Sequence, residues 1–143
     1  MHDSEPTKDA RLLSPALKSV WAKTGLEDGD PYANWLPLVG HAMDAAGVAG
    51  ELWDEWLSES QKATIADCFL ETETPSTDQA RTFATLAAAI HDIGKISKPF
   101  ARQAPRLADR MSEHGLRTAS RDTEEAATNR WMRHELAGAV AIR

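Results

Sequence analysis

The chain has 143 residues, of which 42% are hydrophobic and 27% are charged, and its net charge is -6. This length and composition indicate one ordinary globular domain and exclude fibrous and disordered classes. No apolar run approaches the ~20 residues of a membrane span, and the polar first nine residues are unlike a signal peptide. We therefore expect a cytoplasmic protein without a membrane partner. The single Cys68 cannot form an internal disulfide and is expected to be buried.

Two helices are predicted before residue 58. Ser14-Pro15 is typical of an N-cap and a first helical position, so we expect a short helix over residues 16–23. Residues 26–34 contain three acids, a glycine and a proline, which favour a surface loop. Apolar residues then recur with the helical period from Pro37 to Leu57. His41 lies in the first turn of this long helix and is expected to face its apolar side.

Two more helices are predicted between residues 58 and 94. Ser58 or Ser60 begins the first, which extends to about residue 70. Ser76 and Gln79 have the spacing of a capping box, and the helix that they open ends at Gly94. Its inward-facing residues are expected to be apolar ones: Phe83, Leu86, Ala87 and Ile90.

The remaining predicted helices are short. Residues 97–99 begin one, Pro105 begins another that ends at His114-Gly115, and residues 131–142 form the last. No alternating pattern indicates a strand. The predicted fold is therefore all-α and forms a single domain, with residues 1–13 as a flexible tail.

The chemistry is expected around His91 and Asp92, which follow an apolar helical run and precede Ile-Gly-Lys95. Adjacent helical residues point about 100° apart, but at a helix end both side chains can converge on one cation. An imidazole with a carboxylate suits Mn, Fe, Co, Ni or Zn, whereas Mg prefers oxygen ligands alone. Such an ion acidifies a bound water, and Lys95 adds a positive charge for a phosphate. His41 is a candidate third ligand, and its alternative is a core histidine.

Charge is distributed unevenly along the chain. Residues 1–90 contain 6 basic and 15 acidic side chains, whereas residues 91–143 contain 10 and 7. Arg102, Arg106 and Arg110 recur at every fourth position, and on one helix they would form a basic stripe suited to a nucleic-acid backbone. Pro105 interrupts such a helix, so the alternative is a solvated face paired with nearby acids.

Together these residues resemble the HD superfamily of metal-dependent phosphohydrolases. Within it, the chain resembles the N-terminal HD nuclease of the CRISPR-associated type I interference nuclease-helicase, particularly that of the E subtype. The resemblance extends over nearly the whole chain and is carried by these segments: residues 20–24 (VWAKT), 35–38 (WLPL) with His41, 49–57, 86–95, 99–100 and 133–135 (RHE).

The resemblance implies an HD-domain helical bundle with metal-dependent endonuclease activity. Its substrate would be the single-stranded DNA exposed by an RNA-guided, Cascade-type surveillance complex, and a helicase module would lie on the same or a partner chain. Residue by residue, the metal ligands of one or two divalent ions would be His41, His91, Asp92 and His134. Lys95 matches the lysine that contacts the substrate phosphate, so Asp92 and Lys95 are the expected catalytic residues.

The family pattern continues to a second histidine pair and a later aspartate, which would follow Arg143. We therefore expect a C-terminally truncated bundle that holds part of the site. Two alternatives stay open: a small HD-type nucleotide phosphohydrolase, and a catalytically inactive binding fragment. An apolar face left bare by missing helices would favour a homo-oligomer in the truncated form.

Overall fold

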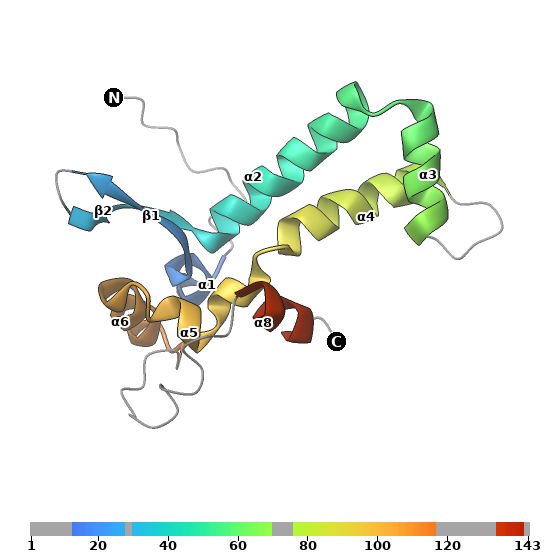
Figure 1. The fold of residues 1–143 in the computed structure, drawn as a ribbon. Helices are drawn as coiled ribbons and strands as arrows, with labels where there is room; N and C mark the ends of the chain where they lie inside the picture. Colours follow the sequence, from blue (N-terminus) through green and yellow to red (C-terminus); the bar gives the residue numbers. More distant parts are fainter. Residues whose placement is uncertain (1–12, 28–29, 70–75, 117–133, 142–143) are drawn as a thin grey trace. The chain divides into compact units, whose positions relative to one another are not determined.

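A computed structural model describes residues 13–27, 30–69, 76–116 and 134–141, and the structural statements below concern those residues (Figure 1). Helices dominate them, which confirms the prediction of an all-α fold. None of the described helices is both long and apolar enough to cross a membrane. The chain divides into two compact units, which we describe separately: residues 1–39 with 93–143, and residues 40–92.

The first unit begins with a short helix, α1 (Pro15–Ser19), whose predicted N-cap is confirmed. The Ser14 hydroxyl accepts a hydrogen bond from the backbone N–H of Leu17 at 3.2 Å. The helix is shorter than expected, because the chain becomes extended at Val20. Two antiparallel strands follow, β1 (Trp21–Glu27) and β2 (Asp30–Pro37).

This hairpin contradicts the predicted helix through Lys23, the predicted loop over residues 26–34 and the absence of strands. Two shifts in the pairing register, between Trp21 and Lys23 and between Gly25 and Glu27, explain why no alternating pattern is visible in the sequence. The Asp28-Gly29 dipeptide, which lies between the two strands in the sequence, is a typical hairpin signal.

The hairpin also fixes the start of the next helix. The backbone N–H of Leu38 donates to the carbonyl of Val20 at 2.7 Å, and both side chains are buried. Leu38 is the first residue of α2, and His41 lies in the same first turn. The pairing therefore anchors the helix that carries a candidate ligand.

The core of the first unit is built from the hairpin and two helices, α5 (Lys98–Ala101) and α6 (Pro105–Glu113). The Trp21 and Phe100 rings stack with centroids 4.3 Å apart and planes at 30°. Buried apolar side chains surround them: Val20, Ala22, Leu38, Ala101, Ala104, Leu107, Ala108 and Met111. Both helix starts agree with the prediction, and α6 ends as expected before Gly115, which has a positive φ of 86°.

Two further elements complete this unit. The 3-10 helix η3 (Ile93–Ile96) begins directly after Asp92, and α8 (His134–Ala141) packs on it. Their contact is close: a Cβ added at Gly138 would lie 3.3 Å from the backbone nitrogen of Gly94. Only a glycine allows the two backbones this approach without displacement.

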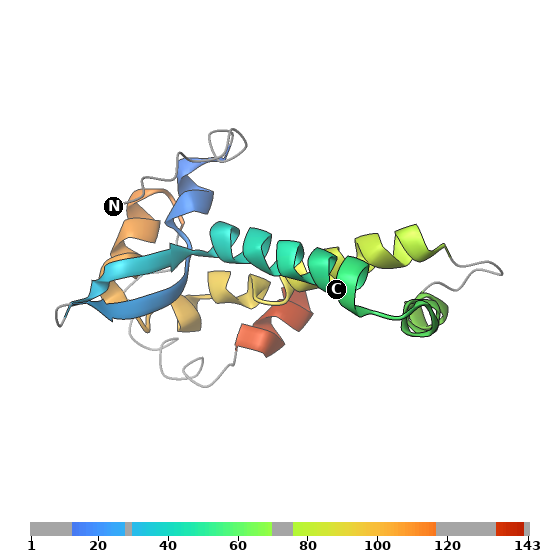
Figure 2. The same ribbon diagram turned by 90° about the horizontal axis from the view of Figure 1, so that it is seen from above.

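The second unit is formed by helices. The predicted long helix is present as α2 (Leu38–Glu51), which continues as one widened π turn, η2 (Leu52–Trp56). The next are α3 (Glu59–Phe69) and α4 (Thr77–Ile90). Figures 1 and 2 show α2 and α4 side by side, with α3 crossing at one end.

Ser58, one of the two serines predicted to begin α3, caps this helix through a reciprocal pair of hydrogen bonds. The backbone N–H of Ser58 donates to Gln61 Oε1 at 2.9 Å, and the backbone N–H of Gln61 donates to Ser58 Oγ at 3.4 Å. Ser76 precedes α4 as predicted, but its side chain makes no capping hydrogen bond.

The core of the second unit lies where the bulky Trp53 meets small residues. Ala66 and Ala80 are buried with it, and Leu57, Ile65 and Ala84 pack around them. The predicted inward face of α4 is therefore wrong, since Phe83 is 39% and Leu86 54% exposed. Cys68 is also exposed rather than buried, because it follows Ala66 by two positions and points to the opposite side of α3.

An exposed ion pair joins η2 to α4. Arg81 donates to both carboxylate oxygens of Asp54, from Nε at 2.8 Å and from Nη2 at 2.5 Å. These hydrogen bonds lower the pKa of Asp54 and raise that of Arg81. A carboxyl group whose pKa is lower in the folded than in the unfolded chain stabilises the folded state at pH values above its unfolded pKa. The pair therefore contributes at neutral pH, and its contribution is lost as acid protonates Asp54.

Candidate metal centre

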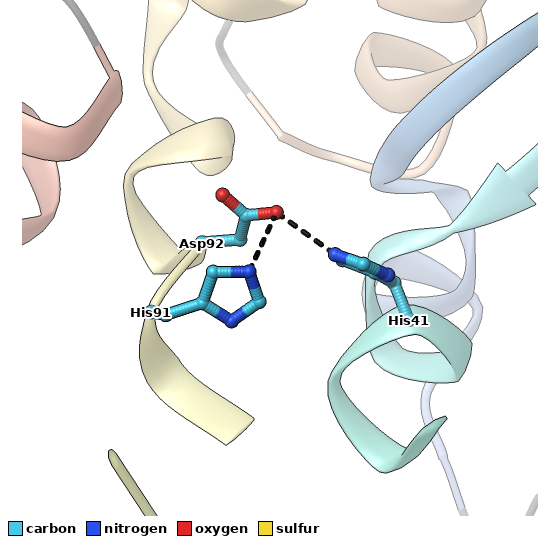
Figure 3. Close-up of side chains that lie close together, drawn as sticks. All are labelled: His41, His91 and Asp92. Atoms are coloured by element: carbon cyan, nitrogen blue, oxygen red, sulfur yellow. Dashed lines mark hydrogen bonds and ion pairs between the residues drawn. The ribbon is translucent and has the colours of Figure 1, made fainter. Parts of the chain in front are cut away.

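Three side chains of the second unit converge on one point (Figure 3). His41 Nε2 lies 2.9 Å from Asp92 Oδ2, and His91 Nε2 lies 3.2 Å from the same oxygen. The two rings meet edge to face with centroids 5.3 Å apart. One ligand atom from each of the three residues lies within 4.8 Å of the others, so the group could hold a metal ion.

The end of α4 makes this convergence possible. The helix ends at Ile90, and His91 caps it with helical backbone angles, φ -54° and ψ -31°. The chain then turns at Asp92 before η3 begins. Two adjacent residues, which would diverge in mid-helix, therefore direct their side chains to the same place. Their environments differ, because the Asp92 residue is 7% exposed while the His91 side chain is 48% exposed.

A backbone contact determines the tautomer of His91. Its Nδ1 lies 2.6 Å from the carbonyl oxygen of Ala88. A carbonyl only accepts, so Nδ1 carries the proton, and in the neutral ring Nε2 presents a lone pair. That lone pair faces the Asp92 oxygen at 3.2 Å, so a proton or a metal ion between the two atoms makes the approach favourable.

The distances fit a coordination sphere. Bonds of about 2.0–2.2 Å from a metal ion to nitrogen and oxygen place neighbouring ligand atoms roughly 2.8–3.6 Å apart, for ligand angles between 90° and the tetrahedral angle. The two separations, 2.9 and 3.2 Å, lie in that range, which is also the range of hydrogen bonds. Two imidazoles and one carboxylate suit a divalent transition metal better than Mg, which prefers an all-oxygen shell.

An apolar groove adjoins the two histidines on α2 and α4. Its volume is about 500 Å³. Asp44 is its one other charged residue, and the rest of the lining is apolar: Ala45, Val48, Ala49, Leu52 and Ala88. The groove therefore offers an open apolar surface directly beside the two imidazoles.

The other predicted site residues lie in the first unit. Lys95 is buried in η3, with its Nζ 5.4 Å from the centroid of the Phe100 ring. His134 is the first residue of α8, and its side chain lies outside the described part of the structure. Neither position tests the roles that the resemblance implies.

The three arginines do not share one helix. Arg102 follows α5 as its C-cap, and Pro105 begins α6, so the predicted interruption of the stripe is confirmed. Arg106 and Arg110 remain one turn apart on α6, where both are exposed. The Arg110 guanidinium lies 5.0 Å from the centroid of the Trp35 ring, within cation–π distance.

Two groups near the candidate catalytic residues were not anticipated from the sequence. The Ala88 carbonyl could have been found only by asking which backbone group lies one turn before His91. Phe100 was noted as part of a motif, but nothing in the pattern indicates its contact with Lys95.

The family model described as "Cas3, HD domain" matches residues 21–143. The chain belongs to the Cas3 HD-domain family. A curated relative, the CRISPR-associated nuclease/helicase Cas3 of Streptococcus thermophilus, is 37% identical over 83 residues, which are 58% of this chain and 9% of the relative. The chain therefore spans a small part of that protein's length. No solved structure matches significantly.

Membership confirms the predicted resemblance to the HD nuclease of a CRISPR-associated nuclease-helicase. Cas3 HD domains are a metal-dependent nuclease family, and the group of His41, His91 and Asp92 is consistent with a metal site of that family.

Proposed function

We propose that this Cas3 HD domain cuts single-stranded DNA with one or two divalent transition metal ions held by His41, His91 and Asp92. The observation that carries the proposal is the convergence of two imidazole nitrogens on one Asp92 oxygen. His134 is proposed as a further ligand from its place in the RHE segment. Mn, Fe, Co, Ni and Zn are the candidate ions, with Mg less suited to the nitrogen donors.

A bound divalent ion supplies an acidified water and neutralises charge on a phosphoryl oxygen. The side chains of this chain provide the arrangement for that chemistry. The Ala88 carbonyl keeps the proton of His91 on Nδ1, which leaves Nε2 for the metal side. Asp92 supplies the negative charge, and Lys95 is proposed to attract a phosphate of the strand.

The charge distribution indicates which part of the chain would bind DNA. Residues 40–92, which contain the three clustered side chains, have ten acidic and only two basic residues. Such a surface repels a phosphate backbone. The strand must therefore be held by residues outside this unit, and the basic residues after position 91 are the candidates.

The partners proposed for the whole protein are a helicase module and an RNA-guided, Cascade-type surveillance complex. The relative from Streptococcus thermophilus is itself named a nuclease/helicase, which supports the helicase partner. The surveillance complex is proposed from the family resemblance, because single-stranded DNA must be exposed before such a nuclease can cut it.

The 143-residue chain tests the proposal with labelled single-stranded DNA, duplex DNA and nucleotides as substrates. With Mn, Co or Ni, we expect cleavage of the single strand in preference to the duplex, and loss of cleavage on chelation. Nucleotide hydrolysis without DNA cleavage would contradict the proposal and favour the small phosphohydrolase. Metal binding with no hydrolysis of any substrate would instead favour the inactive binding fragment.

The exposed apolar side chains of α2 and η2 support self-association of this chain. Val48 is 60%, Leu52 47% and Trp56 80% exposed. Leu52→Glu should lower the average mass measured by sedimentation, because it places a charge in the apolar patch. Val140→Glu is the control, since Val140 is 69% exposed on α8 outside that patch. A monomeric wild-type chain at every concentration would contradict self-association.

A further inference from the structure

Lys95 is buried in an unusual way for a lysine. The residue is only 7% exposed, although lysine is among the residue types that are least often buried. Its ammonium nitrogen lies 5.4 Å from the centroid of the Phe100 ring. A cation within about 6 Å of a ring face is attracted by the negative charge of that face, and burial strengthens this attraction.

Phe100 is itself held in a fixed orientation. It is 7% exposed in α5 and stacks on Trp21 of β1, with ring centroids 4.3 Å apart. Trp21 is 5% exposed, and its Nε1 has no hydrogen-bond partner among the described residues. No hydrogen bond at Nε1 therefore orients the indole. Packing positions it, including the stack on the Phe100 ring.

We propose that Phe100 is a positioning residue, whose ring holds the Lys95 ammonium for a backbone phosphate of the DNA strand. A flexible four-carbon stem gives a lysine ammonium many possible positions, and the Phe100 ring is one of the contacts that limit them. The ring restricts those positions while leaving the charge intact, because a cation–π contact does not neutralise it. This inference rests on the proposed role of Lys95 in binding DNA.

The alternative is that Phe100 only fills the core. The two roles differ in what they require, since core packing needs apolar volume whereas positioning needs the electrons of an aromatic ring. Phe100→Leu keeps an apolar side chain and removes the ring, and Phe100→Tyr keeps the ring. A core role would make both variants weaken DNA binding only as far as they weaken folding.

The experiment is a double-mutant cycle on the 143-residue chain, read out as the affinity for a single-stranded oligonucleotide under chelation, so that no cleavage occurs. We expect Phe100→Leu to weaken binding about 2- to 12-fold, the cost of immobilising one flexible side chain on binding, and Phe100→Tyr to retain it. In the Lys95→Met background, Phe100→Leu should have no further effect. Lys95→Met and Phe100→Leu should each reduce the salt dependence of log Kd by about 0.7, as for one lost phosphate contact on a single strand.

Equal losses from Phe100→Leu in both backgrounds, or an unchanged salt dependence, would overturn the positioning role while leaving the nuclease proposal intact. Unchanged binding by Lys95→Met would remove the role of Lys95 and this inference with it. Failure of the wild-type chain to cut DNA would contradict the proposed function alone, because the cycle is measured without turnover.

Discussion

Asp92→Ala is expected to raise the dissociation constant for Mn or Ni by more than about 100-fold. Its Oδ2 is the atom that the Nε2 atoms of His41 and His91 both approach, so its removal leaves two neutral donors without a negative charge. Loss of an outer-shell partner alone typically costs 10- to 100-fold in metal affinity, and loss of a ligand should cost more. Isothermal titration calorimetry measures the change, and DNA cleavage should fall in parallel.

Asp54→Ala is the matched control for this variant. It removes a carboxylate from the same unit, but one that is exposed. Its partner Arg81 lies near the start of α4, whereas His91 and Asp92 follow its end. Metal affinity should stay at the wild-type value, with a small loss of stability from the broken surface pair. If Asp92→Ala bound metal as tightly as Asp54→Ala, the proposed centre would be wrong.

The His91-Asp92 part of the candidate site was predictable from the sequence because it depends on residues that are adjacent in the chain. A helix must end for His91 and Asp92 to converge, and the apolar run followed by Gly94 indicates such an end. His41, fifty residues earlier, was a candidate from its place in the first turn of its helix, and the family resemblance matched it to a ligand. The structure places its Nε2 2.9 Å from Asp92 Oδ2. The Ala88 carbonyl was not predictable, because a backbone acceptor leaves no trace in the choice of side chain.

The fold was less predictable where packing overrides local pattern. The residues of β1 have no clean alternation because two shifts in the pairing register change the direction of side chains along the strand. In α4, two apolar faces compete for burial, one with Phe83 and Leu86 and one with alanines. Trp53 decides between them, because Ala80 and Ala84 on the alanine face pack in its cluster, and no local pattern in α4 contains that information.

Gly138→Val is expected to destabilise the chain by about 1–3 kcal/mol, the usual cost of overpacking. Gly138 is buried in α8, and a Cβ there would lie 3.3 Å from the backbone nitrogen of Gly94 and 3.4 Å from Ile93 Cγ2. A backbone atom cannot move aside as a side chain does, so α8 must shift on η3. Urea denaturation measures the loss, and Gly138→Ala should show a smaller one.

Gly47→Ala provides a control of opposite sign. No atom lies within 4 Å of a Cβ placed at this exposed position in α2, so the substitution should stabilise the chain by roughly 0.5–1 kcal/mol through helix propensity. A Gly138→Val variant as stable as the wild type would show that α8 and η3 are not in close contact.

The proposed ligand at the start of α8 is tested by its own substitution, with Gly47→Ala as the control. His134 lies four residues before Gly138 on one helix, and η3 begins directly after Asp92. If His134 is a ligand, His134→Ala should weaken metal binding in a chain that stays folded, whereas Gly47→Ala should leave metal affinity at the wild-type value. Unchanged metal affinity of His134→Ala would leave His41, His91 and Asp92 as the proposed ligands.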